Sequence, residues 1–269
     1  MANFNFSIQY EYQIFFRIEL MQTPENLSFP NERDYIQQIS IDCVIFGYKD
    51  EQLKVLIPKI HFEGDFWCVP SGFVYQHEST DQAARRIIEE RTGINTFYLE
   101  QFSVFGNTTR NNKDFLDNLV KLNPDRFENI ESIKAKKAYE WFVQRFVSIG
   151  YYALVDINKV VPQKADIDES IEWYDIKNLP TMIMDHNTIV QKAWEMLRLF
   201  IDQKLSAYNL LPETFTMKEI QQLYEAIFDR PFAANNFPKK ILEQNVLERL
   251  EKQFTGAANK APYLYRLKK

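Results

Sequence analysis

The sequence predicts an α+β fold in two domains, the larger over residues 34–205 and the smaller over residues 206–269. Three observations support this prediction. Strand-like apolar runs follow one another from Tyr35 and enclose one amphipathic helix. The segment YNLLPE interrupts a long helical pattern at Tyr208, and the residues after it have the pattern of two helices followed by two strands.

The composition is that of a soluble globular protein, with 45% hydrophobic and 26% charged residues among 269. No apolar run is long enough to cross a bilayer, and the first residues lack the pattern of a signal peptide. Cys43 and Cys68 lie in apolar runs, so we expect buried free thiols rather than a disulfide or a zinc site. A cytoplasmic protein without a membrane partner is therefore predicted.

Charge is distributed unevenly along the chain. The net charge is −5, yet the residues from Pro231 onward contain eight lysines and arginines against three glutamates, a net charge of +5. The rest of the chain therefore carries −10. A basic terminal domain on an acidic body is typical of a sensor joined to a nucleic-acid-binding domain, although charge runs are more often solvated faces.

The first elements are strands. Residues 1–33 alternate apolar and polar side chains, which indicates either a long strand that bends or reaches a partner subunit, or a poorly ordered extension. Residues 38–48 and 52–60 are two apolar strands joined by Lys49-Asp50-Glu51, the pattern of a hairpin.

The amphipathic helix lies within the stretch from Gly72 to Ile94. Polar residues 78–81 are suited to its start, and Gly93 is suited to its end. The apolar stripe that we expect to face the core consists of Ala83, Ala84, Ile87 and Ile88.

Two further strands are predicted at residues 97–106 and 145–157. The insertion between them, residues 107–144, has the pattern of two short helices and is either a lid or specificity element or a decoration. A strand at 170–180 and a long helix begun by Asp185 complete the larger domain.

The smaller domain begins with Thr216, which can cap a helix over residues 217–228 that ends before Pro231. Asn235 or Asn236 can cap a second, basic helix. Two strands around the loop TGAANKAP follow. Helix, turn, basic helix and β-hairpin is the order of a winged helix-turn-helix domain, although small domains of this kind also serve for dimerisation.

The lead-in EGDFWCVPSGFV and the stretch after it resemble the Nudix box, whose pattern is G-x5-E-x7-R-E-U-x-E-E-x-G-U with U an aliphatic residue. The matching positions are Gly72, Glu78, Arg86, Ile88, Glu90, Gly93 and Ile94. Two positions depart from the pattern, because Ile87 stands in place of a glutamate and Arg91 replaces the second glutamate of the E-E pair. The alternative is an ordinary amphipathic helix that spells part of the pattern.

The resemblance implies a Nudix-type α/β/α sandwich with a mixed sheet, in which glutamates of the box hold a divalent metal. With Ile87 and Arg91 in place of two ligands, we expect no catalytic residues, no metal and no cofactor. We also expect Arg91 to pair with Glu90. The remaining Glu78, Glu89 and Glu90 leave a weak metal site open.

The segment FTMKEIQQLYEAIF…NNFPKKIL resembles the C-terminal domain of Nudix-related transcriptional regulators, and the two resemblances cover the chain from Tyr35 onward. They imply a ligand-responsive regulator, expected as a homodimer on two-fold symmetric operator DNA. Related regulators have a short loop with an R-D-P triplet in place of the insertion, and Arg110 stands at the position of the triplet's arginine.

The resemblance also implies site residues. The effector contacts that we expect are Trp67, Glu90, Arg91, Arg110 and Tyr152. The DNA contacts that we expect are Asn235, Asn236, Lys239, Lys240, Lys252, Lys260 and Arg266.

The family that these regulators form responds to ADP-ribose-type effectors or controls the use of pentoses and other sugars. Few phosphate-facing cations can be placed in the cleft, so we favour a sugar or sugar-phosphate effector over an ADP-ribose-like nucleotide. The alternatives are an active Nudix hydrolase of nucleoside diphosphate derivatives with an accessory C-terminal domain, and a protein-interaction scaffold.

Overall fold

The computed structural model describes residues 35–127, 133–204, 206–233, 235–253 and 261–268. The predictions for residues 1–33 and for Lys260 lie outside these ranges. Within the described residues, none of the helices is both long enough and apolar enough to cross a membrane. Both cysteines are buried free thiols, as predicted.

Six strands of the larger domain form one mixed sheet. They are β1 (Tyr35–Lys49), β2 (Gln52–Ile60), β3 (Ser71–Tyr75), β4 (Tyr98–Phe105), β5 (Val147–Leu154) and β6 (Asp168–Asp175). The order is β4-β5-β1-β2-β6, and β3 pairs with β1. The β1–β5 pair is parallel and the other pairs are antiparallel, so the predicted mixed sheet is confirmed.

The hairpin between β1 and β2 has the predicted turn. Lys49 pairs with Gln52, and the two residues between them, Asp50 and Glu51, have positive φ values of 52° and 59°. A two-residue turn of this kind follows the right-handed twist of its strands.

Helix α2 (Thr80–Thr92) begins and ends as the sequence predicts. The Ser79 hydroxyl accepts a hydrogen bond from the Gln82 backbone N–H, and the Gln82 side chain accepts one from the Ser79 N–H, which forms a capping box. Gly93 ends the helix in the left-handed region at φ 70°. All four residues of the predicted apolar stripe are buried.

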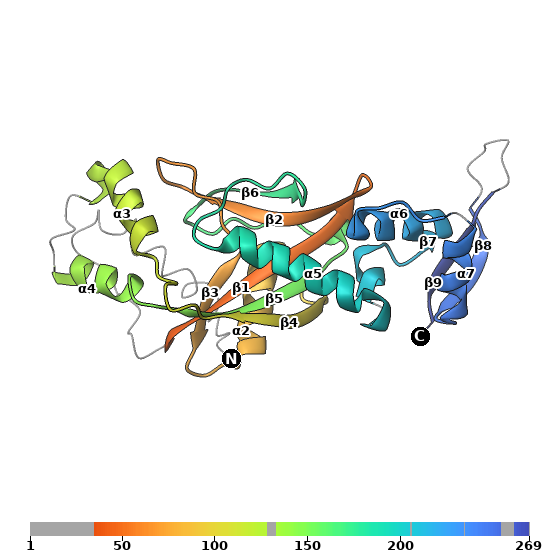
Figure 1. Ribbon diagram of the computed structural model, residues 1–269, viewed down its shortest axis with the longest axis horizontal. Helices are drawn as coiled ribbons and strands as arrows, with labels where there is room; N and C mark the ends of the chain where they lie inside the picture. Colours follow the sequence, from red (N-terminus) through yellow and green to blue (C-terminus); the bar gives the residue numbers. More distant parts are fainter. Residues whose placement is uncertain (1–34, 128–132, 205, 234, 254–260, 269) are drawn as a thin grey trace, which may run out of the picture.

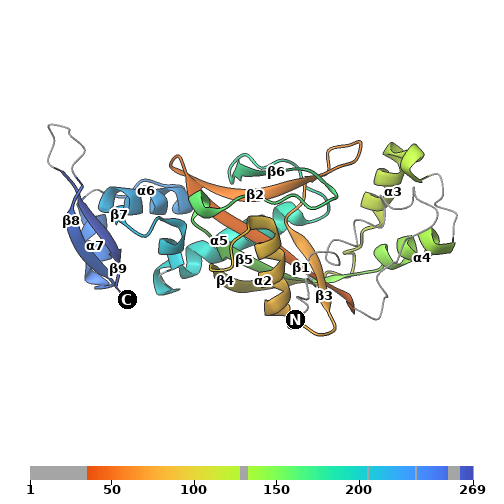
Figure 2. The same ribbon diagram turned by 180° about the vertical axis from the view of Figure 1, so that it is seen from behind.

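Two helices cover opposite faces of the sheet and form the predicted three-layer sandwich. Helix α5 (His186–Lys204) lies across one face in Figure 1, and α2 lies on the other face in Figure 2. The side chains that α5 buries are His186, Ile189, Val190, Ala193, Trp194, Leu197 and Ile201.

The insertion contains the two predicted short helices, α3 (Lys113–Leu122) and α4 (Ile133–Phe142). They lie at one end of the molecule (Figure 1). Asn123 attaches them to the end of β2, because its side-chain oxygen accepts from the Glu63 N–H at 2.7 Å and its amide donates to the Glu63 carbonyl at 3.0 Å.

The C-terminal domain lies at the opposite end (Figure 1). Its elements are β7 (Phe215–Thr216), α6 (Met217–Phe228), α7 (Asn236–Glu243), β8 (Leu247–Lys252) and β9 (Tyr263–Leu267), with the strands in the order β7-β9-β8. The predicted cap at Thr216 is confirmed, because its hydroxyl accepts from the Glu219 N–H and Glu219 accepts from the Thr216 N–H. Strand β7 is not predicted, since two residues are too few to show an alternating pattern.

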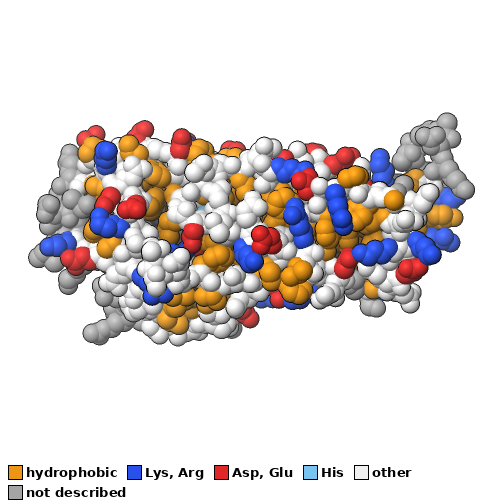
Figure 3. All heavy atoms as spheres, in the orientation of Figure 1, with side chains coloured by type: hydrophobic (Ala, Val, Ile, Leu, Met, Phe, Trp, Pro, Cys, Tyr) orange, Lys and Arg blue, Asp and Glu red, His pale blue; other side chains and the backbone are white. Residues whose placement is uncertain are grey.

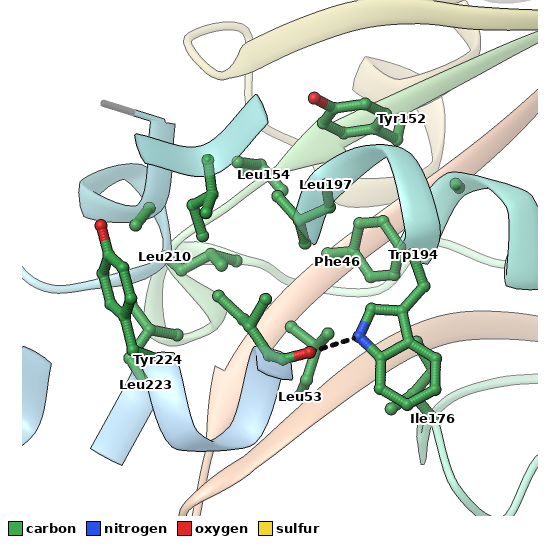
Figure 4. Close-up of a cluster of buried hydrophobic side chains, with 14 of the residues drawn as sticks. Phe46, Leu53, Tyr152, Leu154, Ile176, Trp194, Leu197, Leu210, Leu223 and Tyr224 are labelled. Atoms are coloured by element: carbon green, nitrogen blue, oxygen red, sulfur yellow. Dashed lines mark hydrogen bonds between the residues drawn. The ribbon is translucent and has the colours of Figure 1, made fainter. Parts of the chain in front are cut away.

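Helix α5 also packs against this C-terminal domain. The Trp194 indole and the Arg198 guanidinium both donate to the carbonyl of Ile227, near the end of α6, at 2.8 and 2.7 Å. Figure 4 shows the hydrogen bond from the Trp194 indole within one buried hydrophobic cluster, which extends from Phe46 of the sheet to Tyr224 of α6. The two domains therefore share a continuous core.

Candidate functional site

A cleft lies where β1, β3 and α2 face the insertion. It holds about 1150 Å³ of empty space, counting the part that is open to solvent. One wall consists of Tyr35, Phe73 and Tyr75 from the strands. The α2 side contributes Arg86, Ile87, Glu90 and Arg91, and the insertion contributes Arg110, Asn112, Phe115, Leu116 and Phe142.

Gly72 allows α2 to approach the sheet closely. A Cβ atom at this position would lie 2.9 Å from Cδ1 of Ile87, closer than side chains pack. Ile87 is buried against this glycine. The box position at which the family pattern has a glutamate is therefore filled by packed hydrocarbon.

Arg86 holds two of the remaining glutamates. Its guanidinium contacts both carboxylate oxygens of Glu78, at 2.6 and 3.1 Å, and reaches Glu90 at 3.5 Å. It also donates to the carbonyl of Phe73 at 3.0 Å. A bidentate pair of this kind fixes the glutamate geometrically, so Glu78 serves to anchor the loop before α2.

Arg91 does not pair with Glu90 as expected. Its guanidinium forms an ion pair with Asp168 through Nη1, and Nη2 lies 3.3 Å from the second carboxylate oxygen. The side chains are only 9% and 1% exposed. The reason is orientation, because Arg91 lies on the buried side of α2 beside β6, whereas Glu90 turns towards Arg86.

Arg110 forms a second buried network, at the start of α5. It donates to Asp42 of β1 at 3.1 Å and to Asp185, immediately before α5, at 3.0 Å. Ser148 of β5 donates to the same Asp42 oxygen at 2.5 Å. One arginine of the insertion thus connects the middle of the sheet to the residue that immediately precedes the long helix α5.

His186 has a structural position beside this network. Its Nδ1 accepts a hydrogen bond from the Val69 N–H at 3.1 Å, which requires an unprotonated nitrogen. Burial lowers the pKa of His186, although the nearby Asp42 carboxylate opposes this effect. The imidazole is therefore neutral at pH 7 and holds the loop before β3 against α5.

The divalent metal that the Nudix pattern implies does not fit these residues. Ile87 has no donor atom, and the carboxylates of Glu78 and Glu90 are engaged by Arg86. Glu89 is exposed and points away from the buried side of α2. Among the described residues, no group of three or more His, Cys, Asp or Glu side chains is arranged to hold a metal ion.

The structure brings together three of the five expected effector contacts, since Glu90, Arg91 and Arg110 line the cleft. Tyr152 does not line it. Its ring is 1% exposed and packs against Phe46, Tyr98 and Phe102 beneath α5. It lies four residues beyond Ser148, about 13 Å farther along β5 at about 3.3 Å per residue.

Trp67 also lies outside the cleft. Its ring packs against the core beneath α5, with the Lys59 ammonium 5.3 Å from the ring centroid, and its backbone bridges to Met182. Sequence reasoning missed the carboxylates that neutralise the arginines, Asp42, Asp168 and Asp185. The available signal was Asp42, a charged residue in the middle of the apolar run QISIDCVIFGY.

The expected DNA contacts lie at the far end of the molecule. Asn235 and Asn236 are exposed at the start of α7, although the Asn235 side chain makes no capping hydrogen bond. The Lys239 side chain is 79% exposed. The Lys240 ammonium instead lies 2.6 Å from the Asp202 carboxylate of α5. This ion pair connects α7 to α5, the helix whose other end lies at the cleft.

The remaining expected contacts lie on the β8–β9 hairpin. The Lys252 ammonium is 5.2 Å from the centroid of the Tyr263 ring, and Arg266 pairs with Glu248 at 2.8 Å. Figure 3 shows Lys and Arg side chains gathered on this end of the molecule, over α6, α7 and the hairpin.

Comparisons with known proteins match both parts of the chain. Residues 37–200 match the model of the NUDIX domain, and residues 207–267 match that of the NrtR DNA-binding winged helix domain. A curated relative from Acinetobacter baylyi, named an ADPR responsive transcriptional repressor, is 25% identical over 234 residues, which are 85% of this chain and 81% of the relative.

Two solved structures share the fold. Shewanella oneidensis NrtR complexed with a 27mer DNA has a TM-score of 0.63 and 23% identity, covering 86% of this chain and 94% of that chain. A MutT/nudix family protein from Enterococcus faecalis has a TM-score of 0.61 and 18% identity, covering 94% and 92%. The chain belongs to the Nudix family, and its Nudix domain is followed by an NrtR-type winged helix domain.

Proposed function

We propose that this protein is a DNA-binding transcriptional regulator whose Nudix cleft binds an ADP-ribose-class nucleotide without cleaving it. One observation carries the proposal. Two of the glutamates that the Nudix pattern assigns to metal are replaced, by Ile87 and Arg91, and the other two pair with Arg86. The same chain continues into a domain that matches a DNA-binding winged helix. A cleft of this kind keeps a shape for ligand recognition while lacking the charge that activates water on a metal.

The effector that we propose differs from the sugar favoured on sequence grounds. The curated relative is named for its response to ADP-ribose, which favours this nucleotide class over a sugar. The aromatic walls of the cleft suit a ligand with a planar base better than a free sugar. Arg86 and Arg110 are the side chains that a pyrophosphate would contact, in competition with their carboxylate partners.

For the DNA, we propose that α7 enters the major groove and that the β8–β9 hairpin contacts the backbone. Asn235, Asn236 and Lys239 are exposed on α7 and supply hydrogen bonds to bases or phosphates. Lys252 and Arg266 on the hairpin neutralise phosphates. The homodimer and the two-fold symmetric operator stay predictions.

Helix α5 provides a physical route between the two sites. At the cleft, Arg110 binds Asp185, the residue immediately before α5. Farther along α5, Trp194 donates to the carbonyl of Ile227 in α6, and Asp202 pairs with Lys240 of α7. A ligand phosphate that drew Arg110 away from Asp185 would release the start of this helix. The resulting shift would change how the winged helix meets DNA, which requires about 1–3 kcal/mol of differential binding.

Fluorescence anisotropy of labelled DNA tests this function. A duplex selected by the protein from a random pool is titrated with the protein, with and without ADP-ribose or ribose 5-phosphate. We expect tight binding of the selected duplex and an affinity that ADP-ribose changes at least fivefold. If the protein binds no duplex, the DNA-binding role is rejected. If ribose 5-phosphate but not ADP-ribose changes the DNA affinity, the nucleotide effector is rejected.

A further inference from the structure

Helices α3 and α4 of the insertion, with Asn112 just before α3, form one wall of the cleft, and Asn112 is the polar side chain among the apolar ones of this wall. Phe115 and Leu116 of α3 and Phe142 of α4 line the cleft, together with Asn112. These helices lie between β4 and β5 and contribute no strand to the sheet. The side chains of this wall are therefore candidates for contacts that set the ligand class.

Phe115 presents an aromatic surface to the cleft. The side chain is half-buried, and its ring meets Phe66 edge-on, with centroids 5.5 Å apart and an angle of 80°. Leu116 and Phe142 are buried in the hydrophobic cluster against which Phe115 packs. A ring held in this way offers a stacking surface for a flat group, and every nucleobase has such a face.

Asn112 is the polar group of this wall. It occupies the position before the first turn of α3, yet its side chain makes no capping hydrogen bond. Among the described residues, its side-chain oxygen is buried and has no hydrogen-bond partner. Buried polar atoms are nearly always hydrogen-bonded, so the unpaired oxygen of this cleft-lining residue calls for a donor that the described residues do not supply.

We propose that Asn112 and Phe115 form a base-binding subsite that takes the adenine of the effector. An asparagine amide accepts from the exocyclic N6 amine of adenine and donates to N7, while a phenylalanine ring stacks on the base. The two residues are three positions apart at the start of one helix, so their side chains are neighbours. This inference rests on the proposed function and specifies why the effector is an adenine nucleotide.

A sugar or sugar phosphate would leave both groups unused. Hypoxanthine would also fit less well, because it carries an acceptor oxygen where adenine has the N6 amine. The subsite therefore predicts two preferences, for a ligand with a base over one without and for adenine over hypoxanthine.

Isothermal titration calorimetry on the full chain tests the subsite with ADP-ribose, its hypoxanthine analogue and ribose 5-phosphate. We expect the unmodified protein to bind ADP-ribose about tenfold more tightly than the analogue, a difference of about 1.4 kcal/mol. Asn112→Ala should remove this preference. Phe115→Ala should weaken both nucleotides about tenfold, and Phe115→Trp should restore them. The matched control is Asn118→Ala, on the exposed side of α3, which should bind like the unmodified protein.

The outcomes separate the subsite from the function on which it rests. Equal affinities of the unmodified protein and of both alanine variants would overturn the subsite, while ADP-ribose binding that alters DNA affinity would still support the proposed function. Absence of any ADP-ribose binding by the unmodified protein would reject the effector and the subsite together. If Phe115→Ala does not fold, Asn112→Ala decides the question, because the side-chain oxygen that it removes has no hydrogen-bond partner among the described residues.

Discussion

Replacing Asp168 with asparagine removes the charge that neutralises Arg91 inside the protein. Both side chains are almost fully buried, and the carboxylate also accepts the Ala165 N–H at 2.8 Å. Breaking a buried pair by removing one partner costs about 3–5 kcal/mol, because an uncompensated charge is left in the interior. Folded proteins have total stabilities of about 5–15 kcal/mol, so this single change would remove a large share.

Urea denaturation followed by tryptophan fluorescence measures this loss. With an m-value of about 3 kcal/mol/M, the midpoint should fall by about 1–1.7 M. Asp117→Asn, which removes a carboxylate from an exposed pair with Lys113, is the matched control and should leave the midpoint nearly unchanged. The double variant Arg91→Met with Asp168→Leu should recover most of the loss. Similar midpoints for Asp168→Asn and the control would refute the reasoning.

Three further predictions concern DNA binding, pH and coupling. Lys239→Ala should lower the slope of log DNA affinity against log salt concentration by about one. Lys240→Ala should lower this slope by less, because Asp202 of α5 already pairs with the Lys240 ammonium. Lys192→Ala, which removes a paired surface lysine of α5, is the control and should not alter the slope. The free energy of unfolding should fall as the pH drops below about 6.5. The reason is that His186 binds a proton in the unfolded chain at a higher pH than in the folded protein, where burial lowers its pKa. Urea denaturation of His186→Gln that showed the same pH dependence as the unmodified protein would contradict this. Asp185→Asn should leave the affinity for DNA alone unchanged but reduce the factor by which ADP-ribose alters it, as measured by anisotropy, and an unaltered factor would argue against α5 as the route.

Local signals predicted the elements of this fold well. The turn at Asp50, the cap at Ser79 and the stop at Gly93 depend on neighbouring residues, and each is where the sequence places it. The family resemblance then supplied the three layers and the mixed sheet, which local signals do not contain, but not the order of the strands. A strand of two residues such as β7 carries too little pattern to be read.

The site was predicted less completely, because its chemistry depends on contacts between distant segments. Arg91 and Asp168 are 77 positions apart, so helical spacing could only suggest a neighbour such as Glu90. Tyr152 was expected in the cleft by resemblance to where Nudix folds hold their ligands, yet its depth beneath α5 depends on how the whole sheet is covered. The two helices of the insertion were predicted, but not that Asn112 would line the cleft.

The most direct test of the central claim follows ligand chemistry and DNA binding in one sample. The protein, Mn²⁺, ADP-ribose and a selected labelled duplex are incubated together, and intact ADP-ribose is quantified while anisotropy reports the DNA. A cleft that recognises without cleaving predicts a changed DNA affinity while the ADP-ribose stays intact. Conversion to AMP and ribose 5-phosphate at about 1 s⁻¹ or faster, an ordinary enzymatic rate, would contradict that claim.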